Sequence, residues 1–399
     1  MMDLSRGGTV TGGALIIAGT TIGAGMLALP LLTAFSGFFP SILIYLACWL
    51  FMTATGLLFM EMFLWSKEEV NIVSMAKMTL GSPGKIIAWF LYLYLFYSLT
   101  VAYTSLGGNL VQDLFEGLGQ MSFTWVGPLV FIVIFAPLVA IGAKVVDRIN
   151  FVFMGGLVLS FLVFVVLGIN KIEVNLLLRA DWSFTLLAVP VVFTAFGFQG
   201  TVPTLTNYLD RDSKKASKAI VIGSTIPLIV YILWQALILG IVPLEEVKQA
   251  ISAGQSSIAP LKNQLNHPWF FLVGEFFAFF AVVTSFLGMT LGFFDFLADG
   301  LKVKKDVKGR FLLSLLVFGP PLVFAMFNPS LFLQALQYGG GLGCALLLGV
   351  LPILMVWRGR YTLKYKGEFT LFGGRWVLTL LLLFVTLEIL LIGFKFIVD

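Results

Sequence analysis

Two glycine-interrupted stretches decide how this chain folds. They read Ala18-Gly19-Thr20-Thr21-Ile22-Gly23-Ala24-Gly25 and Ala195-Phe196-Gly197-Phe198-Gln199-Gly200-Thr201, and Pro203 follows the second. Each lies near the middle of an apolar run that is long enough to cross a bilayer as a helix. Glycine weakens helices, so we expect both helices to be broken at mid-membrane. Close packing of small residues is the alternative interpretation, but it explains one such stretch better than a matched pair.

The composition requires a membrane around this chain. Of its 399 residues, 59% are hydrophobic and 11% are charged, whereas a soluble domain carries about 25% charged residues. The two cysteines, Cys48 and Cys344, lie inside apolar runs, so no disulfide framework is expected. The first apolar run begins near Val10 and is longer than the core of a cleaved signal, so we interpret it as the first membrane helix.

Eleven apolar stretches predict an all-α membrane protein with about eleven transmembrane helices. They cover residues 9–35, 38–65, 85–113, 126–143, 149–168, 183–209, 217–241, 269–298, 311–327, 330–356 and 376–396. We therefore expect residues 1–399 to form a single membrane domain.

Loop charges orient the predicted helices. Twenty of the 25 Lys and Arg residues fall at the N-terminus and in alternate loops. The other five are Lys171, Arg179, Lys248, Lys262 and Lys395. Because basic loops stay inside, the N-terminus with Arg6 is predicted to be cytoplasmic and the C-terminus to be outside. The net charge of +5 reflects this loop bias, so a lipid bilayer is the expected partner and nucleic acid is not.

The two interrupted helices occupy matching places in the chain. Each is the first helix of a five-helix block, at residues 9–168 and 183–356, and residues 376–396 form an accessory helix outside both blocks. An odd number of spans inverts the second block relative to the first. Inverted repeats with discontinuous helices place a binding site at the bilayer midplane.

Broken helices suit a zwitterion such as an amino acid. The N–H groups at the start of a half-helix bind a carboxylate, aided by the helix dipole, and freed carbonyls bind an ammonium group. No phosphate-binding loop and no catalytic constellation is visible, so neither an ATP-driven pump nor an enzyme is expected. The glycines of residues 339–343 lie in an apolar run and follow no strand, so no dinucleotide site is expected. No cofactor and no metal site is predicted.

The first interrupted stretch carries a family resemblance. Residues 19–30, from Gly19-Thr20-Thr21-Ile22-Gly23 to Pro30, resemble the first-helix signature of the bacterial hydroxy and aromatic amino acid permeases. The Ile-Gly-Ala-Gly core is also similar to a segment of the wider amino acid–polyamine–organocation transporters. Further matches are Phe196-Gly197-Phe198, Ile222-Gly223-Ser224, Ile226-Pro227-Leu228, Thr284-Ser285-Phe286-Leu287-Gly288 and Phe294-Asp295. The resemblance covers nearly the whole chain and looks closest to the tyrosine-specific permeases.

This resemblance implies a LeuT-type fold of two inverted five-helix repeats. It also implies a bacterial inner-membrane symporter that imports an aromatic amino acid, tyrosine first, with protons by alternating access. The alternatives are tryptophan, phenylalanine or serine and threonine as substrate, sodium as the coupled ion, and a channel or a sensor. Gln199 stands where the tyrosine permeases have His, which argues against a histidine proton relay and weakens the assignment of tyrosine.

The resemblance also assigns substrate contacts. The backbone N–H groups of Gly23, Ala24 and Gly25 would hold the carboxylate. Carbonyls near Thr21, Phe193 and Phe196 would hold the ammonium group. The side chains of Phe196, Phe198 and Gln199 would face the substrate side chain.

Three tyrosines are further candidates for the pocket. Tyr97 and Tyr103 are spaced so that they share one face of the third helix, with Thr100 between them. Tyr338 precedes the glycines of the tenth helix. Ordinary packing is the alternative interpretation for all three.

The ion-coupling candidates are hydroxyls and acids inside apolar runs. Thr284 and Ser285 match a pair that helps to bind sodium in sodium-coupled members of this fold, although hydroxyls also bond back to their own helix. Intramembrane acids are costly and therefore suspected of function. The chain has four, and Glu61 and Asp295 are the favoured proton sites, whereas Glu275 is near an outer helix end and Glu388 is in the accessory helix.

The predicted orientation leads to a direct test. A reporter that is active only outside the cytoplasm should be active when fused after Asp399, and a reporter that is active only inside should be silent there. Activity of the cytoplasmic reporter at Asp399 would contradict the odd number of spans, because an even number returns the chain to the side on which it began.

Overall fold

The computed structural model describes residues 8–66, 70–117, 123–265, 268–328 and 330–398, and these segments are helical, with an isolated β-bridge between Gly37 and Ala180. Arg6 and Asp399, which bear on the predicted orientation, lie outside them. The elements are α1 (Val10–Thr21), α2 (Gly25–Thr33), α3 (Phe38–Trp65), α4 (Ile72–Gly117), α5 (Val126–Ile141), α6 (Ala143–Gly168), η1 (Ile169–Lys171), α7 (Val174–Leu177), η2 (Trp182–Ala188), α8 (Val189–Ala195), η3 (Gln199–Thr201), α9 (Val202–Tyr208), α10 (Ser213–Ile241), α11 (Leu244–Ser252), α12 (Ile258–Leu265), α13 (Pro268–Leu301), α14 (Val307–Phe327), α15 (Leu331–Gln334), η4 (Ala335–Gly340), α16 (Gly341–Cys344), η5 (Ala345–Val350), α17 (Leu351–Tyr361) and α18 (Gly374–Val398).

The prediction of a helical membrane protein is confirmed. Within the described segments, nine helices are long and apolar enough to cross a membrane, and α1 with α2 makes a tenth span that is bent by 59°. Helix α5 is also apolar but has only 16 residues. At 1.5 Å per residue it is about 24 Å long, less than the ~30 Å hydrocarbon core. The expected eleventh span therefore depends on α5.

Several boundaries differ from the sequence prediction for local reasons. Helices α5 and α6 are joined by Gly142 alone, where a loop was expected, because its φ of 123° reverses the chain within one residue. Helix α4 begins earlier than predicted and contains a kink at Gly81, with φ 78°. The connection from α10 to α13 contains α11 and α12, two short helices that the search for long apolar runs did not predict.

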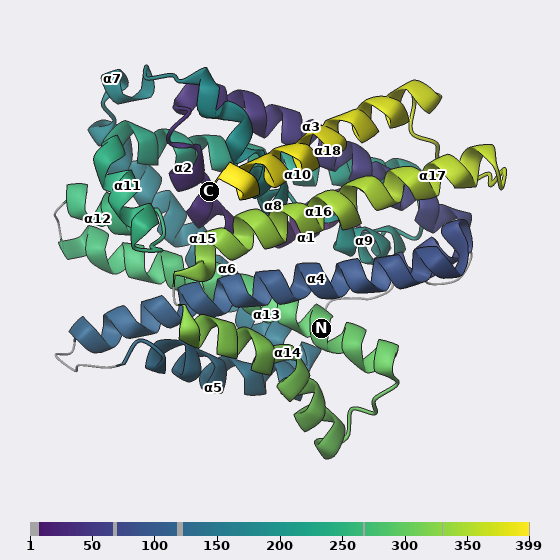
Figure 1. The fold of residues 1–399 in the computed structure, drawn as a ribbon, viewed down its shortest axis with the longest axis horizontal. Helices are drawn as coiled ribbons and strands as arrows, with labels where there is room; N and C mark the ends of the chain where they lie inside the picture. The colour runs from purple at the N-terminus through teal and green to yellow at the C-terminus, as the bar shows by residue number, and fades with distance from the viewer. Residues whose placement is uncertain (1–7, 67–69, 118–122, 266–267, 329, 399) are drawn as a thin grey trace.

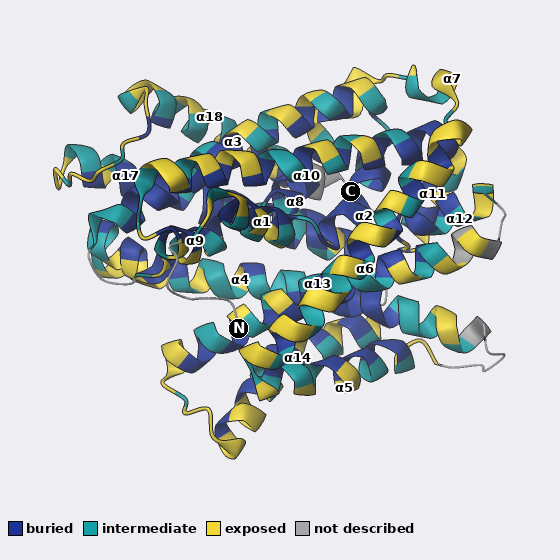
Figure 2. Cartoon of the chain, turned by 180° about the vertical axis from the view of Figure 1, so that it is seen from behind, coloured by how far each residue is buried: buried dark blue, intermediate teal, exposed yellow. Residues whose placement is uncertain are grey.

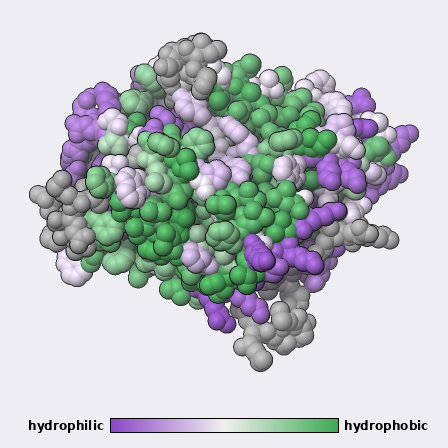
Figure 3. All heavy atoms as spheres, turned by 60° about the horizontal axis from the view of Figure 1, so that its bottom comes forward, coloured by the Kyte–Doolittle hydropathy of each residue, from purple (hydrophilic) through white to green (hydrophobic). Residues whose placement is uncertain are grey.

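The interrupted helices lie in the middle of the bundle. The second break lies in the run Trp182–Tyr208. In the apolar 18-residue stretch of this run 67% of the residues are buried, whereas in the corresponding stretch of α18 22% are buried. Figure 2 shows the same contrast, since buried residues gather around α8 and α10 and exposed residues on the outward faces. A broad apolar area covers the face drawn in Figure 3, as expected for a surface in contact with lipid.

The connections between helices lie at opposite ends of the bundle. Helices α7, α11 and α12 lie at one end, and the connection from α17 to α18 lies at the other (Figure 1). At the first end, Arg179 donates to the carbonyls of Ala34 and Phe35, which follow the C-terminus of α2. A cation there satisfies carbonyl groups that have no partner within the helix.

The turn between α9 and α10 fixes the second broken span to α3. Asp210 and Arg211 both have left-handed backbone angles, with φ 54° and 60°. The Arg211 side chain donates to the carbonyls of Phe63 and Ser66 at the end of α3. Asp212 then caps α10, because its side chain accepts hydrogen bonds from the backbone N–H groups of Lys214 and Lys215. These bonds, chiefly the one from Lys215, favour the charged carboxylate and so lower the pKa of Asp212.

Candidate functional site

The first break leaves two backbone donors free. Helix α1 ends at Thr21 and α2 begins at Gly25, with all of residues 23–25 buried. The N–H of Ala24 donates to the Ser285 hydroxyl of α13 at 2.9 Å. Among the described residues, the N–H groups of Gly23 and Gly25 have no acceptor. Two free donors at the start of a helix can bind an anion.

The second break is held to α3 by Gln199. Helix α8 ends at Ala195, and α9 begins only at Val202. The fully buried amide of Gln199 donates to the Met52 carbonyl at 3.1 Å and to the Thr55 hydroxyl at 2.9 Å, and it accepts the N–H of Phe198. In this conformation the side-chain amide therefore supports the break rather than a ligand.

One hydroxyl joins the two breaks. The Tyr231 hydroxyl on α10 lies 2.7 Å from the carbonyl of Thr21 and 2.9 Å from the carbonyl of Ala195. Thr21 and Ala195 are the last residues of α1 and α8, so two helix C-termini with negative partial charge converge on it. A tyrosine hydroxyl has one proton and satisfies one of these carbonyls at a time. A group with more donors, such as an ammonium ion, can satisfy both.

The positive end of one half-helix touches the negative end of the other. A Cβ added to Gly25 would lie 3.2 Å from the Ala195 Cα, so α2 begins against the end of α8. A Cβ on Gly23 would overlap the Ser285 hydroxyl. Neither glycine has a positive φ, so glycine is needed here for close approach rather than for special backbone angles.

The three phenylalanines of the second break do not all face the junction of the breaks. Phe196 packs its ring edge against Tyr231, with centroids 5.1 Å apart, and so faces the junction of the breaks. Phe193 lies on Phe51 at 4.9 Å, on the side of α3. Phe198 lies against α3 as well, because a Cβ on Gly56 would approach its ring to 2.7 Å. Gly56, in an unbroken helix, is therefore unsuitable as a neutral control for substitutions at the breaks.

The candidate tyrosines lie at different distances from the junction. The Tyr97 hydroxyl donates to the Leu316 carbonyl of α14 at 2.9 Å, away from both breaks. Tyr103 is buried and close enough to Tyr231 to interact with it electrostatically. Tyr338 is half-buried in the π-helical segment η4, in which Gly340 packs against Thr194 of α8. Of the three, Tyr103 is the one that the structure brings close to Tyr231.

The hydroxyls proposed for ion coupling form hydrogen bonds within the protein. The Thr284 hydroxyl donates to the Phe280 carbonyl of its own helix at 2.7 Å. Ser285 accepts the N–H of Ala24, as described above. Both oxygens keep a lone pair, so a cation can bind at this pair without breaking either hydrogen bond.

The acid Glu61 forms a buried ion pair. Its carboxylate accepts hydrogen bonds from two guanidinium nitrogens of Arg360, of which Nε lies at 2.6 Å. It also accepts a hydrogen bond from the backbone N–H of Leu371 at 2.9 Å. Both side chains are at most 9% exposed. Removing one partner of such a pair costs ~3–5 kcal/mol, because the other charge is left buried alone. Glu61 thus joins α3 to α17 and to the chain that leads into α18.

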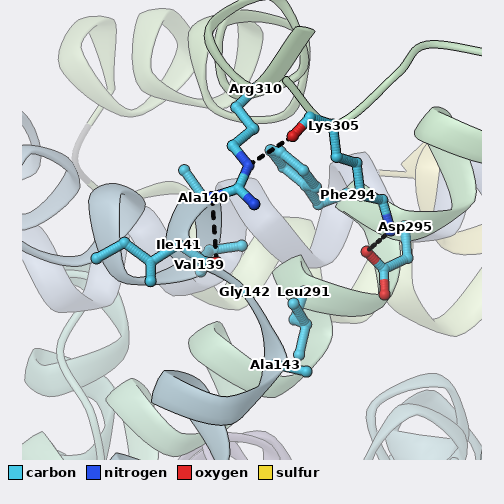
Figure 4. A pocket seen from close by; sticks show the side chains of 10 residues that line it. All are labelled: Val139, Ala140, Ile141, Gly142, Ala143, Leu291, Phe294, Asp295, Lys305 and Arg310. Carbon is cyan, nitrogen blue, oxygen red and sulfur yellow. Dashed lines mark hydrogen bonds and ion pairs between the residues drawn. The ribbon is translucent and has the colours of Figure 1, made fainter. Parts of the chain in front are cut away.

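The acid Asp295 lies near one end of the bundle. It is half-exposed and pairs with Lys305 at 2.8 Å. Figure 4 shows both residues at a pocket of about 190 Å³, together with Arg310, which donates to the carbonyl of Ile141. Ten residues separate Asp295 from Ser285 on α13, which is about 15 Å along the helix axis. Asp295 is thus remote from the breaks.

Sequence reasoning missed Tyr231, the residue that joins the breaks. A signal was present one helical turn later, at Gln235, which is a buried amide in the middle of an apolar helix. Gln235 bonds to the Tyr45 hydroxyl and to the Thr33 hydroxyl, both at 2.7 Å. Polar side chains at this depth indicate the functional face of a membrane helix.

Known proteins resemble this chain over nearly its whole length. The sequence profile of the tryptophan/tyrosine permease family matches residues 6–392. The chain is 36% identical over 386 residues to the tyrosine-specific transport system 1 of Haemophilus influenzae, covering 93% of each protein. It is 35% identical to the tyrosine-specific transport system 2 of the same organism, covering 96% of this chain and 95% of that relative. It is 32% identical to the organism's tryptophan-specific transport protein, covering 96% and 94%.

The contact between Gly25 and Ala195 leads to a mutational test. Gly25→Val should weaken substrate binding by ~10- to 100-fold, because overpacking a tight contact costs ~1–3 kcal/mol. Gly155→Val on α6 is the matched control, since nothing lies within 4 Å of a Cβ there. Both variants should remain monodisperse in detergent. Equal binding of substrate by the two purified variants would show that the Gly25 contact does not shape the site.

Proposed function

The chain belongs to the tryptophan/tyrosine permease family, and we propose that it imports an aromatic amino acid, tyrosine first, together with protons. The observation that carries this proposal is the junction of the two breaks. There, free N–H groups at Gly23 and Gly25 lie beside the carbonyls of Thr21 and Ala195.

The junction suits the two charged groups of an amino acid. The carboxylate would accept the N–H groups at the start of α2, where the helix dipole is positive. The ammonium group would donate to the carbonyls at the ends of α1 and α8, replacing the single proton of Tyr231. The α-amino acid is the substrate class with both groups on one carbon, so it matches donors and acceptors that are this close together.

Tyrosine is the first choice of substrate for two reasons. Two of the relatives described above are named for tyrosine and share slightly more identity with this chain than the one named for tryptophan. Phe196 and Tyr103 supply aromatic surface near Tyr231 for the ring of the substrate. Competition by all the standard amino acids against labelled tyrosine would test this choice, and stronger competition by tryptophan would reverse it.

Proton coupling is proposed first because the resemblance to the aromatic amino acid permeases implies it. Thr284 bonds back to its own helix, and Ser285 is held by the backbone of the first break. Each hydroxyl oxygen keeps a lone pair, so these hydrogen bonds do not exclude a sodium ion at the pair. Sodium coupling through Thr284 and Ser285 is thus the second candidate.

Transport would proceed by alternating access between two inverted repeats, at residues 9–168 and 183–356. In this structure the N–H of Ser257, between α11 and α12, donates to the carbonyl of Leu27 at 3.0 Å. This contact covers α2 two residues beyond the break. Gly200, in contrast, is exposed, and nothing lies within 4 Å of a Cβ there. We assign this conformation to a state closed toward the outside of the bacterial inner membrane, with α11 and α12 outside.

Gradients in proteoliposomes test the proposal. An inwardly directed pH gradient without sodium should drive accumulation of labelled tyrosine. For one proton per substrate, a gradient of one pH unit supports up to about 10-fold accumulation. Accumulation driven only by sodium would replace the proton with the second candidate. Equilibration without accumulation under either gradient would contradict a symporter and favour a channel.

A further inference from the structure

A carboxyl group without a partner is buried against the centre of the bundle. Glu388 of α18 is 1% exposed, although α18 as a whole lies at the edge of the bundle. Within the described part of the chain, neither of its carboxyl oxygens has a hydrogen-bond partner. The sequence placed Glu388 in an accessory helix far from the repeats, but its side chain turns inward.

The face of α18 that carries Glu388 packs on the second broken span. Phe384, one turn earlier, stacks on Phe193 of α8 with centroids 5.9 Å apart. Val385 contacts η5, since a Cβ on Gly349 would approach its methyl group to 2.9 Å. This face therefore belongs to the interior of the transporter.

The groups around Glu388 do not neutralise it. The titratable groups close enough to interact with it are Cys48 of α3 and Cys344 of α16. Tyr45 is on α3 with Cys48, but its hydroxyl donates to Gln235. Helix α17 carries Arg358, Arg360 and Tyr361 in its last turns, and the segments η2, α8 and η5 carry no charged side chain. Arg360 is already paired with Glu61.

Burial without donors decides the protonation state of Glu388. An ionised carboxylate loses its hydration in an apolar interior and needs hydrogen-bond donors or a counter-charge in return. The structure supplies neither, so the neutral acid is the form that this conformation accommodates. A charged Glu388 would require a conformation in which water reaches it.

Cys344 is close enough to Glu388 to interact with it electrostatically and also lies beside the second break. Cys344, which interacts with Glu388, has its sulfur 3.7 Å from the position of a Cβ on Gly197. Gly197 is in the interrupted segment between α8 and α9. A change of charge and hydration at Glu388 would therefore act on the packing beside the break.

We propose that Glu388 is the proton-binding carboxyl of this transporter, and this inference rests on the proposed proton symport. The carboxylate takes a proton from a hydronium ion in the water on the outer side, and the neutral acid is then buried as seen here. The O–H bond breaks when water reaches the group from the cytoplasmic side, and the proton passes to that water. No other reactant is needed.

Infrared spectroscopy tests the protonation of Glu388 without any transport. The purified protein at neutral pH should show the carbonyl stretch of a protonated carboxylic acid. Glu388→Gln should remove that band, whereas Glu368→Gln should keep it, because Glu368 is exposed in the loop before α18. A band that persists in Glu388→Gln, or a wild-type protein without one, would overturn the proposal.

Proteoliposomes test the coupling role. With a gradient of one pH unit, the wild-type protein and Glu368→Gln should approach about 10-fold accumulation, and Glu388→Gln should equilibrate at a ratio of about 1. Exchange of labelled for unlabelled tyrosine at equal pH should continue in Glu388→Gln, which a merely misfolded protein would not support. Accumulation by Glu388→Gln, or loss of its exchange as well, would contradict a coupling role. If the wild-type protein itself does not accumulate tyrosine under the pH gradient, proton symport is contradicted. The infrared band would still report whether Glu388 binds a proton.

Discussion

A polypeptide in lipid must satisfy every backbone polar group internally, and this chain breaks that rule at two places in its centre. A free N–H or C=O group in hydrocarbon costs several kcal/mol, so an interrupted membrane helix persists only if the surrounding protein or a ligand meets the cost. Here the ends of α1 and α8 share the hydroxyl of Tyr231, and one of the donors at the start of α2 is met by Ser285. The donors and carbonyls that these groups leave unsatisfied define the site.

The same constraint accounts for residues around the site. Gly25 allows α2 to begin against Ala195, which brings a positive and a negative helix end together. Within the second break, the Gln199 side chain forms hydrogen bonds to Met52 and Thr55 and so connects the break to α3. At the outer edge, α18 presents an unpaired acid to the interior, where its charge has no compensation. The proposed binding of a substrate and the proposed binding of a proton would thus both satisfy polar groups that the apolar bundle leaves incomplete.

The sequence predicted the breaks, the helical membrane class and most spans, because each depends on local pattern. Glycines inside long apolar runs mark interruptions without knowledge of the fold. The role of Tyr231 could not be predicted in this way, since it depends on the packing of α10 against two segments far away in the chain. The direction in which Glu388 points, and the contact of Gly56 with Phe198, have the same origin. A sequence shows that a helix carries an acid or a glycine, but only tertiary packing decides which neighbour it meets.

The central claim is that backbone groups at the two breaks hold the carboxylate and the ammonium group of the substrate. Equilibrium binding to the purified protein tests it with tyrosine, with tyramine, which lacks the carboxylate, and with 3-(4-hydroxyphenyl)propionate, which lacks the amine. Hydrogen bonds to a charged group contribute ~1.5–3 kcal/mol each. Loss of two such bonds should therefore weaken binding of either analogue by about 100-fold or more. If tyramine or the propionate binds as tightly as tyrosine, the corresponding break does not hold the substrate, and the account is wrong.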